Sequence, residues 1–331
     1  MFDPALADRR ADMVPLDPPE HTRMRKLAAR DFTSRRIHDL LLGVDMLIGS
    51  FLDELERAGP PADLVSSLAV PLPAAVMCLV LGIPEADRAG LYRWVNPFTS
   101  AAPATSNETK DPIDIGTALA DMYDYVGRLV AHRMESPGDD LLSDMICARN
   151  GPDALSEEEL VATTALMIVA GQETTSKAIS RGVMVLAGSP YWRELASGAL
   201  PAEHLVEEVL RHQSPVDTAI FRSAKVDTEL AGVPIKAGEQ LFVSLQLANL
   251  DPSGRRNPRV FDAYRGDQAH MSFGYGPHFC LGAGLARAEL AAAFMALAAR
   301  FPMLRLDVPL SELTWSVGSV VNAPTCLPVA W

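Results

Sequence analysis

Cys280 is the side chain whose surroundings point most clearly to chemistry. It stands in the stretch Met271–Leu285 (MSFGYGPHFCLGAGL), whose glycines and proline exclude a regular helix or strand. An alanine-rich apolar segment follows, so this tight loop delivers one thiol to the start of a buried helix. Unpaired N–H groups and the helix dipole lower the pKa of a cysteine there and favour the thiolate. A lone thiolate suits a single metal bond better than a zinc cage, and haem iron is one such metal. The alternative is an inert cysteine in a glycine-rich turn.

A second group of reactive side chains lies inside the longest predicted helix, Ser156–Ala187. This helix begins with the capping-box pattern Ser-x-x-Glu, and its interior is apolar nearly all round. Glu173 and Thr174 interrupt that interior just after a mid-helix glycine, Gly171. A carboxylate in a central helix is costly unless water or a partner reaches it, and a threonine hydroxyl can divert a backbone carbonyl. These residues indicate either a proton-transfer site or a solvent-facing turn at an ordinary kink.

The elements that must position these residues are mostly helices. Apolar periodicity and helix stop signals predict helices over His21–Asp31, Ile37–Ala58, Ala74–Leu81, Glu85–Phe98, Ile113–Glu135, Asp139–Arg149, Ser156–Ala187 and Pro201–Gln213. The polar stretch Thr99–Pro112 is predicted to be a loop, either a mobile lid or a plain surface connection. The C-terminal stretch Asp307–Trp331 alternates apolar and polar positions and predicts short strands and turns.

Composition limits the classes of function. The 331 residues are 48% hydrophobic and 21% charged, as in a soluble globular protein, and the formal charge of −13 disfavours nucleic acid as a partner. The four cysteines are far apart, which indicates neither a zinc site nor a disulfide framework and fits the reducing cytoplasm. The longest apolar run, Ala165–Ala170, is too short to span a bilayer, so no membrane partner is expected.

The order of the motifs resembles the cytochrome P450 superfamily, in its bacterial, soluble form. The pattern Phe-Gly-x-Gly-x-His-x-Cys-x-Gly resembles the haem-binding loop and is filled by Phe273, Gly274, Gly276, His278, Cys280 and Gly282. Ala-Gly-x-Glu-Thr-Thr, from Ala170, resembles the oxygen-activation motif of the I helix. Glu208-x-x-Arg211 before Ser-Pro-Val resembles the K helix, and DPPEHTRMR, from Asp17, resembles the opening of the C helix.

This resemblance implies a mainly α fold with small β-sheets and one haem b (iron protoporphyrin IX). Cys280 would be the axial metal ligand, and Glu173 and Thr174 would deliver the protons that dioxygen cleavage consumes. The other residues expected to contact the cofactor are His21, Arg25, Ala170, Gly171, Arg222, Phe273, Gly274, His278 and Gly282. Of these, His21, Arg25, Arg222 and His278 would hold the propionates.

The resemblance also implies a structural clamp behind the haem, formed by Glu208 and Arg211. The family usually completes this clamp with an arginine just before a phenylalanine, but this chain has Val260 there. Either Arg259, one place earlier, replaces that arginine after a local shift, or the clamp is weaker.

The expected activity is that of a haem-thiolate monooxygenase. It would insert one oxygen atom of O2 into, or oxidatively couple, a partly apolar small molecule or natural-product intermediate that contacts Leu166, Val169, Ala170 and Thr218. A separate ferredoxin-type donor would supply electrons, docking on the eight Lys and Arg residues between Arg9 and Arg36, whose other face would hold the haem carboxylates. Two alternatives stay open: a haem-binding protein with a scaffold or ligand-binding role and no turnover, or a peroxide-driven oxidase.

The resemblance covers the chain from about Asp17 to Trp331, so residues 1–331 are expected to form a single haem-thiolate domain. The family's N-terminal helix, first strands and B–C loop have no counterpart in the sequence. The expected consequence is an open sheet edge and an exposed distal haem face. A start codon assigned too late, a fragment and a genuinely short enzyme would each explain this.

Overall fold

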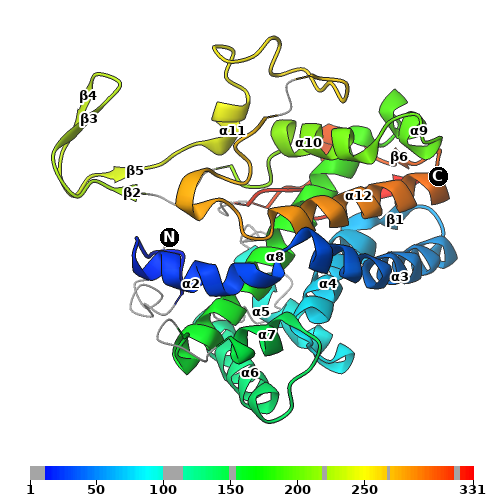
Figure 1. Ribbon diagram of the computed structural model, residues 1–331. Helices are drawn as coiled ribbons and strands as arrows, with labels where there is room; N and C mark the ends of the chain where they lie inside the picture. Colours follow the sequence, from blue (N-terminus) through cyan, green and yellow to red (C-terminus); the bar gives the residue numbers. More distant parts are fainter. Residues whose placement is uncertain (1–11, 100–114, 149–153, 218–221, 267–268, 317–320) are drawn as a thin grey trace.

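The computed structural model of residues 1–331 describes residues 12–99, 115–148, 154–217, 222–266, 269–316 and 321–331 (Figure 1). Its fold is mainly helical, as expected. The α-helices are α2 (Glu20–Ala28), α3 (Ser34–Ala58), α4 (Pro71–Leu81), α5 (Arg88–Thr99), α6 (Ile115–Glu135), α7 (Leu141–Cys147), α8 (Glu157–Leu186), α9 (Pro190–Ala196), α10 (Ala202–His212), α11 (Leu245–Asn249) and α12 (Ala283–Arg300). Short helical turns lie at Ala29–Asp31, Val65–Ala69, Glu85–Asp87, Gly276–His278 and Leu310–Glu312.

The strands are short and form three small antiparallel sheets. They are β1 (Ala62–Asp63), β2 (Arg222–Ser223), β3 (Thr228–Leu230), β4 (Val233–Ile235), β5 (Gln240–Leu241), β6 (Arg305–Leu306) and β7 (Pro328–Ala330). One sheet has the order β1-β7-β6, so it joins the first quarter of the chain to its C-terminal end; β2 pairs with β5, and β3 with β4. Within the described residues, neither β2 nor β5 has a second partner strand.

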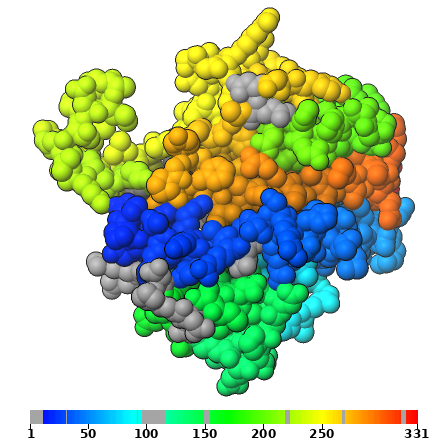
Figure 2. Space-filling view, in the orientation of Figure 1, coloured from blue at the N-terminus to red at the C-terminus, as the bar shows by residue number. Residues whose placement is uncertain are grey.

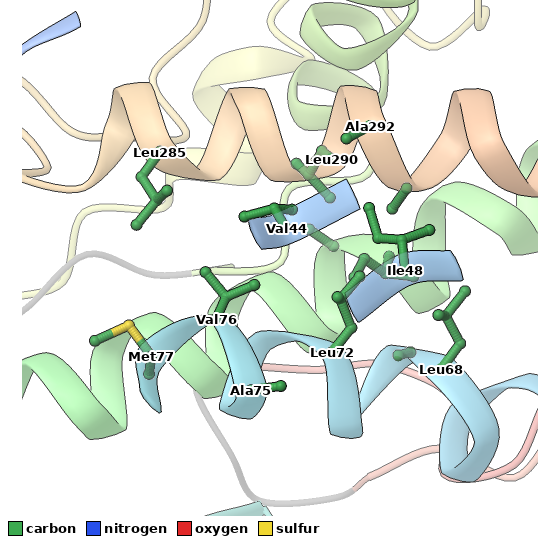
Figure 3. Packing of buried hydrophobic residues seen from close by; sticks show 14 of the residues in the cluster. Val44, Ile48, Leu68, Leu72, Ala75, Val76, Met77, Leu285, Leu290 and Ala292 are labelled. Atoms are coloured by element: carbon green, nitrogen blue, oxygen red, sulfur yellow. The ribbon is translucent and has the colours of Figure 1, made fainter. Parts of the chain in front are cut away.

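Helix α8 is the centre of the core. Its capping box is formed as predicted, with the Ser156 side chain accepting from the N–H of Glu159 and the Glu159 side chain accepting in return. Helices α4, α6, α10 and α12 pack around it (Figure 1). Figure 3 shows Val44 and Ile48 of α3 held between α12 and α4, and both side chains are almost fully buried. Each such side chain contributes roughly 1.5–3 kcal/mol of transfer free energy.

Two predicted helices begin earlier than expected. Helix α3 begins at Ser34 and not at Ile37, and the Thr33 side chain caps it by accepting from the N–H of Arg36. Helix α4 begins at Pro71 and not at Ala74, because Pro71 and Pro73 lie in its first turn, where a missing N–H costs no hydrogen bond. The short helices α9 and α11 and strand β1 were not predicted, since each is too short to show a periodicity. The predicted loop Thr99–Pro112 falls almost entirely outside the described residues.

The surface has one clear protrusion. The hairpin of β3 and β4 stands away from the body of the molecule (Figures 1 and 2), and Leu230 and Val233 near its tip are exposed. Among the described helices, none is both long and apolar enough to cross a membrane.

Candidate active site

The loop that carries Cys280 is folded back on itself by backbone hydrogen bonds. The N–H of Cys280 donates to the carbonyl of Phe273 (2.8 Å), and Gly274 and Gly276 adopt φ angles of 72° and 76°, in the left-handed region that glycine tolerates best. Helix α12 begins at Ala283, three residues after the cysteine. The predicted arrangement, a glycine-rich loop that presents one thiol at the start of a buried helix, is therefore correct.

A buried amide fixes the start of this loop. The Asn249 side chain at the end of α11 accepts from the N–H of Met271 (2.7 Å) and donates to the Ser272 hydroxyl (2.9 Å). That hydroxyl donates in turn to the carbonyl of Leu210 in α10 (2.7 Å). Asn249 is 1% exposed, so these bonds form away from water. They tie the loop to two helices, a link that the sequence pattern did not reveal.

Glu207 of α10 forms a second anchor. Its carboxylate accepts two hydrogen bonds from Arg287 of α12 (2.6 and 3.0 Å) and lies 3.1 Å from His270. Burial alone would raise the pKa of Glu207, but the hydrogen bonds and charges of His270 and Arg287 outweigh it and lower the pKa to about 2. The Arg287 guanidinium also lies 4.5 Å from the centre of the Phe273 ring. Glu207 thus holds both flanks of the cysteine loop.

The expectation that Cys280 has a lowered pKa is wrong for this structure. Burial raises the pKa of the thiol, and this outweighs the N–H of Gly282 and the charges of Arg25 and Arg287, which lower it. The start of helix α12 contributes one N–H contact to the sulfur, and this lowers the pKa less than burial of the sulfur raises it. A bound cation would therefore supply the charge that favours the thiolate.

Basic side chains gather beside the cysteine loop. The rings of His21 and His278 lie 4.0 Å apart, His21 is 1% exposed, and neither of its ring nitrogens has a hydrogen-bond partner. Burial first, then the charges of Arg25 and of the other imidazole, lower the pKa of His21. Burial, followed by the charges of Arg222 and Arg25, lowers the pKa of His278. The guanidinium of Arg25 donates to the carbonyl of Phe279 in the same loop. These four basic groups form a site of positive potential suited to carboxylates.

Helix α8 presents a strip of accessible small and apolar side chains in the middle of the protein. Ala170 is exposed, and Leu166, Val169, Gly171 and Thr174 are partly exposed, although most of the helix is buried. The Thr174 hydroxyl donates to the carbonyl of Ala170 (2.7 Å), the local bond that was anticipated for a threonine here. Residues Glu157–Leu186 nevertheless form one continuous α-helix, so neither Gly171 nor Thr174 ends it.

Glu173 is held in an unusual environment for a carboxylate. It is 8% exposed and its Oε1 atom has no hydrogen-bond partner. Burial raises its pKa to about 7, with the charge of Lys177 acting in the opposite direction. A carboxyl group with that pKa exchanges its proton readily at neutral pH.

The clamp of Glu208 and Arg211 is present, and the residue that completes it is not Arg259. Glu208 and Arg211 are both fully buried and joined by two hydrogen bonds of 2.6 and 2.8 Å. Arg265 completes the clamp, with its Nε 3.5 Å from Glu208. Arg259 instead contacts His212 through its carbonyl (2.8 Å). Arg265 reaches Glu208 because of the path that the irregular segment after α11 takes. The spacing of residues in the sequence does not reveal that path.

The predicted site residues thus fall into two groups. His21, Arg25, His278 and Cys280 come together around the loop, and the charge of Arg222 acts on His278. The second group lies along α8 and consists of Ala170, Gly171, Glu173 and Thr174. Thr218 lies outside the described residues. The sequence interpretation missed Glu207, Asn249, Lys177 and Arg265; of these, only Lys177 had a visible signal, a charge four residues after Glu173 in an apolar helix.

The residues fit a haem group. A lone, half-buried thiol is a suitable axial ligand, the ring of His21 without a partner among the described residues and its basic neighbours suit two carboxylates, and the accessible strip of α8 suits an apolar ring. The unsatisfied polar atoms of His21 in particular call for a polar partner that the described residues do not provide.

Comparisons with known proteins agree. The family model "Cytochrome P450" matches residues 202–326. The chain is 39% identical over 322 residues to the nocardicin C N-oxygenase of Nocardia uniformis subsp. tsuyamanensis, which covers 96% of this chain and 79% of the relative. It is 37% identical to the mycinamicin IV hydroxylase/epoxidase of Micromonospora griseorubida, with 96% and 79% covered. Among solved structures, the LnmA cytochrome P450 hydroxylase of Streptomyces atroolivaceus superposes with a TM-score of 0.87 at 36% identity, covering 97% of this chain and 82% of that one.

Proposed function

Because this chain belongs to the cytochrome P450 superfamily and is a haem-dependent monooxygenase, we propose that Cys280 is the axial ligand of its haem iron. The observation that carries this assignment is the placement of the thiol in a loop that is anchored on both sides and lies beside a cluster of basic groups. When bound, haem b supplies the iron at which dioxygen is activated and one oxygen atom is passed to the substrate.

Four basic side chains are proposed to hold the two haem carboxylates: His21, Arg25, Arg222 and His278. His21 would gain the partner that its ring nitrogens lack among the described residues, and the carboxylates would offset the burial and the neighbouring positive charges that lower the pKa of both imidazoles. The two guanidinium groups can each bind a carboxylate through two parallel hydrogen bonds.

The faces of the haem are proposed to contact two sets of small or flat residues. Phe273, Gly274 and Gly282 come from the cysteine loop, and Ala170 and Gly171 come from α8. Ala170 and Gly171 have the two smallest side chains, so the helix backbone can approach a flat ring closely. This is supported by the exposure of Ala170 in the middle of a mostly buried helix.

Glu173 and Thr174 are proposed to supply the protons for oxygen activation. Thr174 presents a hydroxyl that can leave the Ala170 carbonyl and hydrogen-bond to dioxygen in the site. Glu173, with a pKa near 7, can take a proton from water and release it toward Thr174 at neutral pH. The orphaned Oε1 atom supports this role, because it is free to accept a hydrogen bond from a water molecule.

The proposed substrate is a partly apolar small molecule, such as a natural-product intermediate, which is oxygenated or oxidatively coupled. Two observations support it. The accessible side chains of Leu166 and Val169 are apolar, and two relatives carry names that specify oxidation of nocardicin C and mycinamicin IV.

A separate ferredoxin-type protein is the proposed electron donor. Lys26, Arg30 and Arg35 are exposed on α2, the turn after it and α3, and they favour an acidic partner. Arg23 and Arg36, from the same basic region, belong instead to ion pairs within the chain, so the docking surface is smaller than the sequence indicated. Residues 1–331 are proposed to act as one haem-thiolate domain, since the described helices share one core.

The test is the spectrum of the reduced protein with carbon monoxide. Thiolate-ligated haem gives a strongly red-shifted Soret band, which Cys280→Ala should abolish and the exposed-thiol control Cys147→Ala should leave intact. An unchanged band in Cys280→Ala would refute the ligand assignment. Turnover is then measured with a ferredoxin system and, separately, with hydrogen peroxide. Product with peroxide alone would favour the peroxide-driven alternative, and no product with either would favour a binding role.

A further inference from the structure

Three charged residues follow one another along one face of the buried helix α8. Glu173, Lys177 and Arg181 are spaced four apart, so they lie on the same side of the helix. They are 8%, 6% and 5% exposed. Lys177 also lies three residues after Thr174 and therefore neighbours it on the helix surface. A row of buried charges inside an apolar helix is expensive and calls for a specific compensation.

At the C-terminal end of this row, other residues compensate the charge of Arg181. Arg181 pairs with Asp217 at 3.4 Å and donates to the carbonyl of Asn322 at 3.0 Å. The Gln246 amide, oriented to satisfy both groups, donates to Asp217 (3.0 Å) and accepts from Arg181 (3.2 Å). The Asp217 side chain is 32% exposed, so this end of the row reaches solvent.

Lys177 has no such neutralising contact. No ion pair within 4 Å involves Lys177 in the part of the chain that the structure describes, and Glu173 is the one charged group there that shifts the pKa of Lys177. The reverse also holds, since Lys177 is the one described charge that acts on the Glu173 carboxyl. Two buried charges that interact across a gap wider than a hydrogen bond are suited to a bridging water molecule.

We propose that Lys177 is a positioning residue for proton delivery: its ammonium group sets the charge of Glu173 and, through water, orients that carboxylate beside Thr174. The Arg181–Asp217 pair fixes the row at its solvent end. This inference rests on the proposed role of Glu173. Lys177 itself donates no proton in oxygen activation.

The direct test follows the Glu173 carboxyl in the haem-loaded protein by infrared difference spectroscopy over a pH series, with Glu173→Gln to assign the band. An opposite charge at this range lowers a carboxyl pKa by about one unit or more. Lys177→Met should therefore raise the pKa of Glu173 by about one unit, and Lys177→Arg should restore most of the shift. Lys236→Met, at an exposed lysine just after β4, is the control and should leave the pKa of Glu173 unchanged.

A second readout is the fraction of consumed electrons that appears in product, measured against pH. Lys177→Met should shift this profile toward higher pH by about one unit, and the shift should be absent when Glu173→Gln is also present. An unmoved Glu173 titration and profile in Lys177→Met would overturn the inference. Wild-type coupling in Glu173→Gln would instead overturn the proposed role of Glu173. If Lys177→Met fails to fold, Lys177→Gln carries the same comparison with a polar side chain.

Discussion

Glu207 allows a quantitative test of how the cysteine loop is held. The substitution Glu207→Gln keeps the shape of the side chain but removes the charge that faces Arg287 and His270. The pKa of Glu207 falls from 4.5 to about 2 in the folded protein. At about 1.4 kcal/mol per unit, this corresponds to roughly 3 kcal/mol of stability. The side chain is 20% exposed, so solvent screening reduces that figure only modestly.

The pH dependence shows in which pH range the Glu207 charge stabilises the fold. Because the folded pKa is depressed, the contribution of Glu207 is fully present above pH 4.5 and is lost as the pH falls toward 2. Urea unfolding of wild type and variant should therefore differ by about 2–3 kcal/mol at pH 7, and the difference should shrink steadily between pH 4.5 and 2. The control Glu203→Gln, exposed on the same helix, should change stability by less than about 0.5 kcal/mol.

Two results would refute this reasoning. A difference that is constant across the pH range would mean that lost packing, and not lost charge, destabilises the variant. No difference at pH 7 would mean that Glu207 does not anchor the loop. A loss of the red-shifted carbon monoxide band at pH 7, while the helical circular dichroism persists, would place the damage at the loop itself.

Three further predictions concern the buried charges and the tight packing of the core. Arg211→Met leaves Glu208 buried without its main partner and should cost about 3–5 kcal/mol, measured by urea unfolding. Gly182→Ala places a methyl group 2.3 Å from the Phe294 ring and should destabilise by about 1–2 kcal/mol, although alanine favours helix; thermal unfolding checks this, and a gain in stability would contradict it. Glu173→Gln should stabilise the protein above pH 7 but not below pH 4.5, because the raised pKa makes the wild type lose stability as the pH rises from 4.5 through about 7; unfolding at pH 4 and pH 8 separates the two cases.

Local signals in the sequence predicted much of the fold. The capping box at Ser156, the glycine after α3 and the loop around Cys280 all act through residues close in sequence, so their patterns carried the information. The helix start at Pro71 was placed three residues late, because proline was treated as a break and not as a first-turn residue. The pairing of β1 with β7 joins residues more than 260 apart and left no local trace.

The sequence by itself determined the chemical types at the site: one thiol in a glycine-bent loop, an acid and an alcohol in a central helix, and basic residues near the first described helix. Only the tertiary structure decided the pKa values of these groups and the partners they contact. Burial raises the pKa of Cys280 where helix position alone predicted the opposite, and burial also brings Glu173 to about 7. Arg265 takes the third arm of the clamp because the irregular segment folds back over α10. Desolvation and long-range contacts depend on what surrounds a side chain in space, and no sequence spacing reports that.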